Sequence, residues 1–177
     1  MSGLKKAFII VTAILLGLAM VGFILPSEYK VQRSIVISAP SEKIFPHLVN
    51  LKKWQNWGVW FKRDPNMEIE YSGQEGEIGM KSSWVSATQG NGEMTIIALE
   101  INRRMTYSLS FPDLPNPSTG EFLLKQVDGG TEVTWMDYGN MGMNPINHYF
   151  VFLMDYMIGP DFETGLDNLK MVAEASL

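Results

Sequence analysis

The sequence predicts an α+β fold in which a seven-stranded antiparallel sheet curves around a long C-terminal helix, preceded by one N-terminal transmembrane helix. Three patterns lead to this prediction: an uncharged apolar run near the N-terminus, seven short runs of strand-like alternation, and a long amphipathic pattern at the C-terminus. An antiparallel sheet with one polar face needs a cover on its other face. The last helix supplies that cover, which gives the helix-grip arrangement.

The N-terminal apolar run covers residues 7–25 and reads "AFIIVTAILLGLAMVGFIL". Its length is close to the roughly 20 residues with which a helix crosses a bilayer. Lys5 and Lys6 precede it, whereas Glu28 and Lys30 follow it. Because cytoplasmic flanks carry the excess of positive charge, we expect a cytoplasmic N-terminus.

A cleaved signal peptide is the main alternative to a membrane anchor. Its apolar run is typically about 7–15 residues long and ends at a site of small residues. Here the run is longer and ends with "ILPS" at residues 24–27. We therefore expect an uncleaved signal anchor over residues 1–26 and a domain over residues 27–177, on the extracytoplasmic (periplasmic) side of the inner membrane.

The composition narrows the function classes. The chain has 177 residues, enough for one domain, and 0 Cys, which removes disulfides, thiolate nucleophiles and cysteine-ligated metals. Without Lys5 and Lys6, 12 Lys and Arg stand against 19 Asp and Glu, a formal charge of −7. This charge argues against nucleic acid, and against an anionic lipid surface, as the main partner.

The first strand and the helical segment follow the anchor. Residues 28–38, "EYKVQRSIVIS", alternate as a half-buried strand does, and residues 39–54 change to a helical period. Six strand-like runs separated by turn residues come next, which predicts antiparallel hairpins. They are "MEIEYSG" (67–73), "GMKSSWVSA" (79–87), "GEMTIIALEI" (92–101), "RRMTYSLSF" (103–111), "TGEFLLKQV" (119–127) and "GTEVTWMDY" (130–138).

The C-terminal segment predicts a helix over residues 145–173. Its later part is amphipathic, with Ile158, Phe162 and Leu166 at helical spacing. Its earlier part, "HYFVFLMDYMIG" at residues 148–159, is apolar nearly all round and predicts a buried helix with a kink at Gly159-Pro160. That surplus of apolar side chains predicts a cavity between helix and sheet, with the roughly 300–1,000 Å³ typical of a small-molecule site.

Four stretches together resemble the SRPBCC superfamily (START-like). They are "VQRSIVISAPSEKIFPHLVNLKKWQNWGVWFKRDP", "GNGEMTI", "GTEVTW" and "YGNMGMNPINHYFVFLMDYMIGPDFETGLDNLK". Within that superfamily the chain is similar to bacterial polyketide cyclase/dehydrase and lipid-transport-like proteins, including membrane-anchored members. The resemblance implies a seven-stranded sheet that grips the last helix around an apolar cavity. It implies a hydrophobic ligand and no universal active site.

Three tryptophans at a spacing of three, Trp54, Trp57 and Trp60, are the most unusual local feature. They lie about thirty residues beyond the anchor, too far for an aromatic belt at the membrane. A hydrophobic core and a cavity wall remain open as explanations. The full set of ligand-binding candidates is Trp54, Trp57, Trp60, Trp84, Tyr107, Phe111, Phe122, Phe150 and Met154.

Arg33 is a possible polar anchor for a ligand. It shares strand parity with Val31 and Ile35, so a regular strand points it to the apolar side, where it needs a partner. Asp137, an anionic ligand headgroup and a structural ion pair are the three options.

No catalytic or metal motif is present in the sequence. The two histidines, His47 and His148, lie about a hundred residues apart with no cysteine to complete a site, so we expect no metal and no cofactor. Asp155 and His148 are weak candidates for a pocket acid or base.

Three functions remain open from the sequence. The first is a membrane-anchored domain that binds a small hydrophobic molecule or lipid. The second is an enzyme of the polyketide cyclase/dehydratase type that uses a pocket acid or base, and the third is an interaction domain without a ligand.

Overall fold

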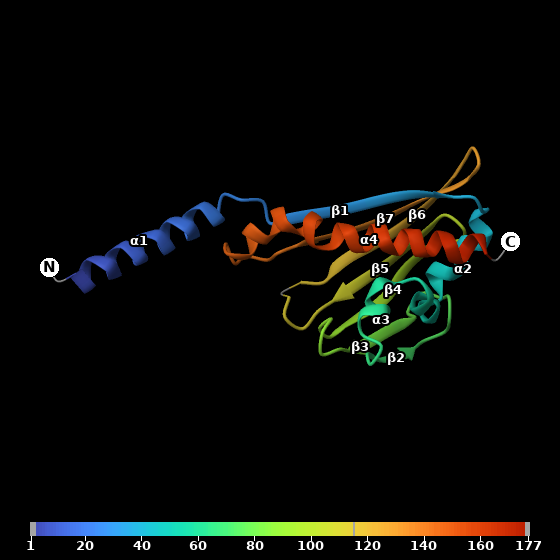
Figure 1. Cartoon of the computed structure of the whole chain (residues 1–177), viewed down its shortest axis with the longest axis horizontal. Coiled ribbons are helices and arrows are strands. Elements are labelled where there is room, and N and C mark those ends of the chain that lie inside the picture. Colours follow the sequence, from blue (N-terminus) through green and yellow to red (C-terminus); the bar gives the residue numbers. More distant parts are fainter. Residues whose placement is uncertain (1–2, 115, 176–177) are drawn as a thin grey trace.

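The computed structural model describes residues 3–114 and 116–175 (Figure 1). Its elements are α1 (Gly3–Gly22), β1 (Glu28–Ile37), α2 (Ser41–Val49), η1 (Leu51–Asn56), α3 (Val59–Arg63), β2 (Glu68–Ser72), β3 (Lys81–Val85), β4 (Gly92–Glu100), β5 (Arg104–Ser110), β6 (Ser118–Val127), β7 (Gly130–Asn140), η2 (Asn147–Phe150) and α4 (Val151–Glu174).

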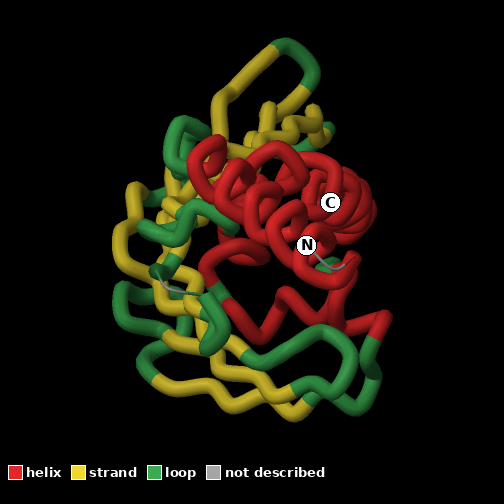
Figure 2. Tube along the Cα trace, turned by 90° about the vertical axis from the view of Figure 1, so that its left-hand side faces the viewer, coloured by secondary structure: helices red, strands yellow, loops and turns green. Residues whose placement is uncertain are grey.

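The seven strands form one antiparallel sheet in the order β1-β7-β6-β5-β4-β3-β2. Every neighbouring pair is antiparallel, and the first strand pairs with the last. The register shifts between Ile96 and Ala98 in β4, a bulge that bends the sheet. α4 lies across the concave side (Figures 1 and 2), so the predicted helix-grip fold is confirmed.

The core lies where α4 meets the sheet and the short helices η1 and α3. Phe162 of α4 stacks on Trp135 of β7 with ring centroids 4.0 Å apart, and Leu166 and Leu169 are buried beside it. Trp54 of η1 and Trp57, which directly follows η1, pack edge-on against the same Trp135 ring. Large aromatic areas removed from water at one point hold the helix on the sheet.

The first turns of α4 differ from the prediction. The segment 148–159 was expected to be a buried helix, but a 3₁₀ turn precedes α4 and the outer side chains of the segment are exposed. A helix on one sheet buries only one stripe, and no other described element covers the opposite side. α4 is a single helix that continues through Pro160.

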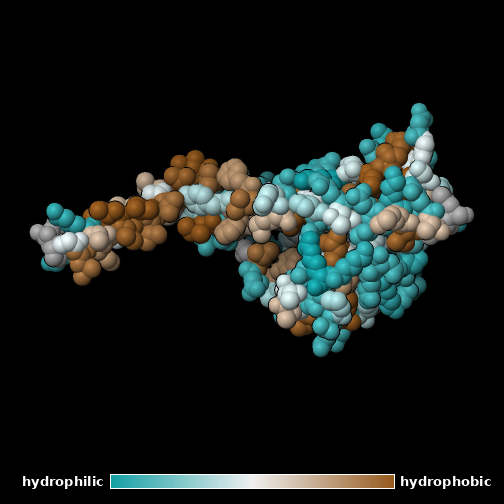
Figure 3. All heavy atoms as spheres, in the orientation of Figure 1, coloured by the Kyte–Doolittle hydropathy of each residue, from teal (hydrophilic) through white to brown (hydrophobic). Residues whose placement is uncertain are grey.

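α1 stands apart from the sheet and projects from one end of the domain (Figure 1). It is long and apolar enough to cross a membrane, by length and composition. Figure 3 shows its hydrophobic surface beside a domain surface that is mostly hydrophilic.

Candidate functional site

A pocket of about 200 Å³ lies between the sheet, the short helices η1 and α3, and α4. Its walls are mainly aromatic and aliphatic, and a few polar groups gather among them. The lining residues are Tyr29, Trp54, Trp60, Phe61, Met67, Ile69, Ser82, Trp84, Gln89, Met94, Tyr107, Leu109, Phe111, Leu114, Ser118, Trp135, Asp137, Met154, Ile158 and Phe162. The volume is below the expected range because bulky indole and phenyl rings occupy the space under α4.

The tryptophan cluster serves both core and pocket. Trp54 and Trp60 lie on the pocket wall, whereas Trp57 lies behind it and is completely buried. The indole N–H groups of Trp54 and Trp57 donate to the carbonyl oxygens of Leu48 (2.8 Å) and His47 (3.2 Å). Each buried N–H therefore has a partner, which fixes both rings against α2.

The other aromatic candidates also divide between the wall and its surroundings. Trp84, Tyr107, Phe111 and Met154 line the pocket. Phe122 is completely buried behind the wall, where its ring stacks on Trp135. Phe150 is 47% exposed and does not line the pocket, because it lies on the outer side of the chain just before α4.

One end of the pocket is polar. Asp137 accepts hydrogen bonds from the hydroxyl groups of Tyr29 and Ser118, each at 2.9 Å. The Asp137 side chain is almost fully buried, and no cationic side chain in residues 3–114 and 116–175 forms an ion pair with it. Nearby, Tyr107 accepts from the Trp135 indole N–H at 2.8 Å, which leaves the Tyr107 hydroxyl proton free to donate.

Strand register explains how these groups meet. Asp137 pairs with Gly120 of β6, and Gly120 pairs with Tyr107 of β5, so Asp137 and Tyr107 share one row and one face. A Cβ on Gly120 would overlap the Tyr107 ring, and a Cβ on Gly139 would lie in tight contact with the ring of Tyr29. Glycine at these two places lets phenol rings lie across the sheet.

The surroundings shift the proton affinities of this cluster. Burial raises the pKa of Asp137 to about 6, and the two hydroxyl donors limit that rise by stabilising the carboxylate. Burial and the nearby Asp137 carboxylate raise the pKa values of Tyr29 and Tyr107 well above their ordinary range. Both phenols therefore remain protonated donors at neutral pH.

The sequence model of the family described as "Polyketide cyclase / dehydrase and lipid transport" matches residues 28–174. The chain belongs to this family. No curated protein matches the chain.

Solved structures of the same fold accompany this family match. A Staphylococcus aureus protein of unknown function, SA2116, has a TM-score of 0.64 at 14% identity and covers 84% of this chain and 95% of its own. The di-domain ARO/CYC protein StfQ from the steffimycin biosynthetic pathway has a TM-score of 0.65 at 12% identity over 84% of this chain and 52% of that chain. NE0264 from Nitrosomonas europaea has a TM-score of 0.60 at 12% identity and covers 84% of this chain and 96% of its own. At these identities the likeness shows the fold.

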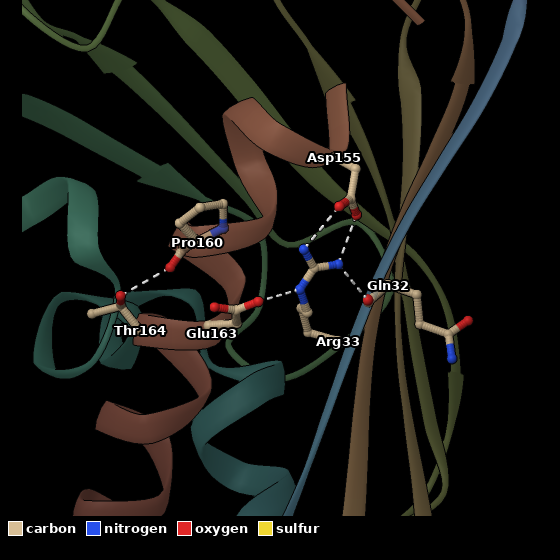
Figure 4. A network of polar contacts seen from close by, with 6 residues as sticks. All are labelled: Gln32, Arg33, Asp155, Pro160, Glu163 and Thr164. Carbon is tan, nitrogen blue, oxygen red and sulfur yellow. Dashed lines mark hydrogen bonds and ion pairs between the residues drawn. The ribbon is translucent and has the colours of Figure 1, made fainter. Parts of the chain in front are cut away.

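In this family member, Arg33 is held by α4 and not by Asp137 (Figure 4). It lies opposite Trp135 in the sheet, and its guanidinium donates to Asp155 at 2.7 and 3.0 Å and to Glu163 at 2.5 Å. Gly159 makes room for it, since a Cβ there would overlap the guanidinium. Arg33 therefore ties β1 to α4 at the surface, outside the pocket lining.

The two weak candidates for a pocket acid or base lie away from the pocket. Asp155 is exposed, and its hydrogen bonds from Arg33 lower its pKa, so it stays ionised at neutral pH. His148 is buried where the chain approaches α1, with its ring nitrogens 2.8 Å from the Gly22 carbonyl oxygen and 2.9 Å from that of Gly142. Neither side chain lines the pocket.

Sequence reasoning did not find the polar end. Tyr29 shares strand parity with Val31 and Ile35 but was not a candidate, and Asp137 was considered only as a partner for Arg33. Ser118 follows a proline-rich loop and carries no signal of its own. The usable signal was the shared parity of Asp137 with Val133 and Trp135, which points its carboxyl group inward.

Proposed function

We propose that residues 27–177 bind a small hydrophobic molecule or lipid in the pocket between the sheet and α4. We further propose that residues 1–26 anchor this domain in the inner membrane, with a cytoplasmic N-terminus and the domain outside the cytoplasm. Membership in a cyclase and lipid-transport family supports a hydrophobic ligand, and the length and composition of α1 support the anchor.

The observation that carries the binding proposal is a mainly apolar pocket with a buried carboxyl group, that of Asp137, at one end. Apolar walls with a few placed polar groups are the usual character of a small-molecule site. Each carboxylate oxygen of Asp137 receives one protein donor and keeps a second lone pair. A ligand with an apolar body and one hydroxyl or amine group would complete this end.

Copurification tests the proposal. The full chain, isolated from its membrane in nanodiscs, should retain a hydrophobic molecule that native mass spectrometry detects and that solvent extraction releases. Met154→Trp should lower its occupancy by filling the pocket, whereas Ile101→Trp, on the turn between β4 and β5, should not. Equal occupancy in both variants would argue against this pocket, and no ligand in any preparation would favour the ligand-free interaction domain.

A second candidate function is catalysis by Asp137. Its pKa of about 6 suits a group that exchanges protons near neutral pH, and the Tyr107 hydroxyl is a donor on the same row of the sheet. Bound molecules extracted from the native protein and from Asp137→Asn distinguish the candidates. A binding protein retains the same compound in both, whereas an enzyme accumulates an unreacted compound in the variant.

A further inference from the structure

An apolar surface lies at the start of α4 and in the loop before it, on the side away from the pocket. It consists of seven exposed large side chains: Met143, Ile146, Phe150, Phe152, Leu153, Tyr156 and Met157. We call this the α4 entry surface. Residues 138–154 contain no Asp, Glu, Lys or Arg. Contiguous apolar surface of this kind marks a contact with a partner or a membrane.

Three contacts attach this region to α1. The Tyr149 hydroxyl donates to the Leu18 carbonyl oxygen at 2.7 Å, and the His148 ring lies 2.8 Å from the Gly22 carbonyl oxygen. Gly22 also packs so closely on Pro145 that a Cβ would overlap it. The loop and η2 are therefore held beside the last turn of α1, from which α4 runs away along the domain (Figure 1), and Figure 3 shows hydrophobic side chains continuing from α1 onto this end of the domain.

The contact between Tyr149 and Leu18 lies inside the hydrophobic span of α1. The 20 residues of α1 extend about 30 Å, which matches the hydrocarbon thickness of a bilayer. Leu18 precedes the helix end at Gly22 by one turn, about 6 Å along the axis. If α1 spans the membrane, Tyr149 reaches below the edge of the hydrocarbon, and its neighbours Ile146 and Phe150 lie at the boundary with the headgroups. Tyrosine is enriched at that boundary.

The charges nearby are compatible with this position. Asp155 is the first charged residue after Asp137, and Arg33 pairs with both of its carboxylate oxygens (Figure 4). The domain carries a formal charge of −7 without Lys5 and Lys6, so charge does not attract it to anionic lipids. The contact must come from apolar side chains.

We propose that the α4 entry surface inserts into the outer leaflet of the same bilayer that α1 spans, so that two elements dock the domain on the membrane. This rests on the proposed anchor. The turns of α4 that touch lipid on one side carry Met154 and Ile158 on the pocket side. One end of the pocket therefore lies on the opposite face of the helix turn that we propose to contact lipid.

Depth-dependent quenching tests this in the full chain. The protein has 0 Cys, so no native cysteine has to be removed first. Each single-cysteine variant can therefore be labelled at one site with an environment-sensitive fluorophore. Phe152→Cys and Tyr156→Cys report on the α4 entry surface, and Leu15→Cys reports on α1. Ile101→Cys is the matched control, because it is equally apolar and exposed at the opposite end of the sheet. The labelled chains are placed in phosphatidylcholine vesicles with a nitroxide high on the acyl chain or at its middle.

We expect the shallow nitroxide to reduce fluorescence at position 152 and less strongly at position 156, which lies about one turn further along α4 from α1. The mid-chain nitroxide should reduce it at position 15, and neither should affect position 101. Quenching at position 15 with none at 152 and 156 would overturn the docking and leave the anchor intact. No quenching at position 15 would overturn both. Labels at 152 and 156 that are shielded from water but not quenched, in a dimeric chain, would also overturn the docking. They would show that the α4 entry surface contacts a second copy of this chain.

Discussion

At the scale of single residues, Asp137 experiences two opposing effects. Burial under α4 disfavours its charged form, and the hydroxyl groups of Tyr29 and Ser118 favour that form. Burial is the larger effect, so the pKa rises to about 6 from its ordinary 3.8. A carboxyl group in this state costs stability when it ionises, which suits a site whose ligand supplies the missing partner.

This shift predicts a pH dependence of stability. Because the folded state holds the Asp137 proton more tightly than the unfolded state, the contribution of Asp137 is most favourable below about pH 4 and is lost as pH rises to about 6. The full loss is up to about 3 kcal/mol. Urea unfolding of the native protein and of Asp137→Asn between pH 4 and 7 isolates this contribution. Parallel profiles would show that the Asp137 pKa is not raised.

Trp57 belongs to the buried core and does not line the pocket, so we expect its main effect on stability. Its indole is completely buried among Trp54, Phe122 and Trp135. Trp57→Ala should lower the free energy of unfolding by about 3–5 kcal/mol, the range for removing a core aromatic. Ile101→Ala, at an exposed turn, should change it by no more than about 0.5 kcal/mol. A loss near that of the control would contradict the burial of Trp57.

At the scale of elements, Arg33 of β1 binds α4 through Asp155 and Glu163. Position 159 of α4 has no side chain, which leaves room for the guanidinium group. Exposed ion pairs of this type contribute about 0–1 kcal/mol each. Their main effect here is on position, because they hold the first turns of α4 against the edge strand β1. The outer face of these turns stays exposed.

A double-mutant cycle tests this fastening. In an Arg33→Ala background, Gly159→Ala should raise the free energy of unfolding by up to about 1 kcal/mol, since alanine favours helix over glycine. With Arg33 present the same change should bring no gain, because the guanidinium is displaced from Asp155 and Glu163 at a cost of about 1 kcal/mol. Chemical denaturation of all four proteins gives the coupling. Equal effects in both backgrounds would show that Arg33 does not need the space at Gly159.

The limits of sequence reasoning also appear at this scale. Alternation and helical spacing are local patterns, so the seven strands and the last helix could be predicted. The turn of Asp128 and Gly129 is local too, and it fixes Asp137 opposite Gly120. The pairing of β1 with β7 joins strands about a hundred residues apart with no turn to set the register. The contacts of Tyr29 and Arg33 could therefore not be derived.

The exposed start of α4 was missed for a different reason. An apolar run predicts removal from water, but it does not say whether protein or lipid removes it. The sequence of residues 148–159 was therefore interpreted as core, whereas the structure places much of its apolar surface on the outside, beside α1.

At the scale of the whole molecule, the proposed arrangement is a pocket held at the outer surface of a membrane. An external protease added to cells with a permeabilised outer envelope should digest the domain. The mature chain should retain Lys5 and Lys6 and stay in the membrane fraction after an alkaline wash. A mature N-terminus near Ser27 would contradict the anchor, and protection from the protease would contradict its orientation.

We propose that the space between the sheet and α4 receives a hydrophobic molecule. The most direct measurement is titration of the folded domain, residues 27–177, with an apolar fluorescent probe while tryptophan emission is followed. We expect saturable binding with quenching, because Trp54, Trp60 and Trp84 line the pocket. Met154→Trp should weaken it and Phe150→Trp, outside the pocket, should not. Non-saturable binding, or equal binding by both variants, would show that the probe does not occupy this space.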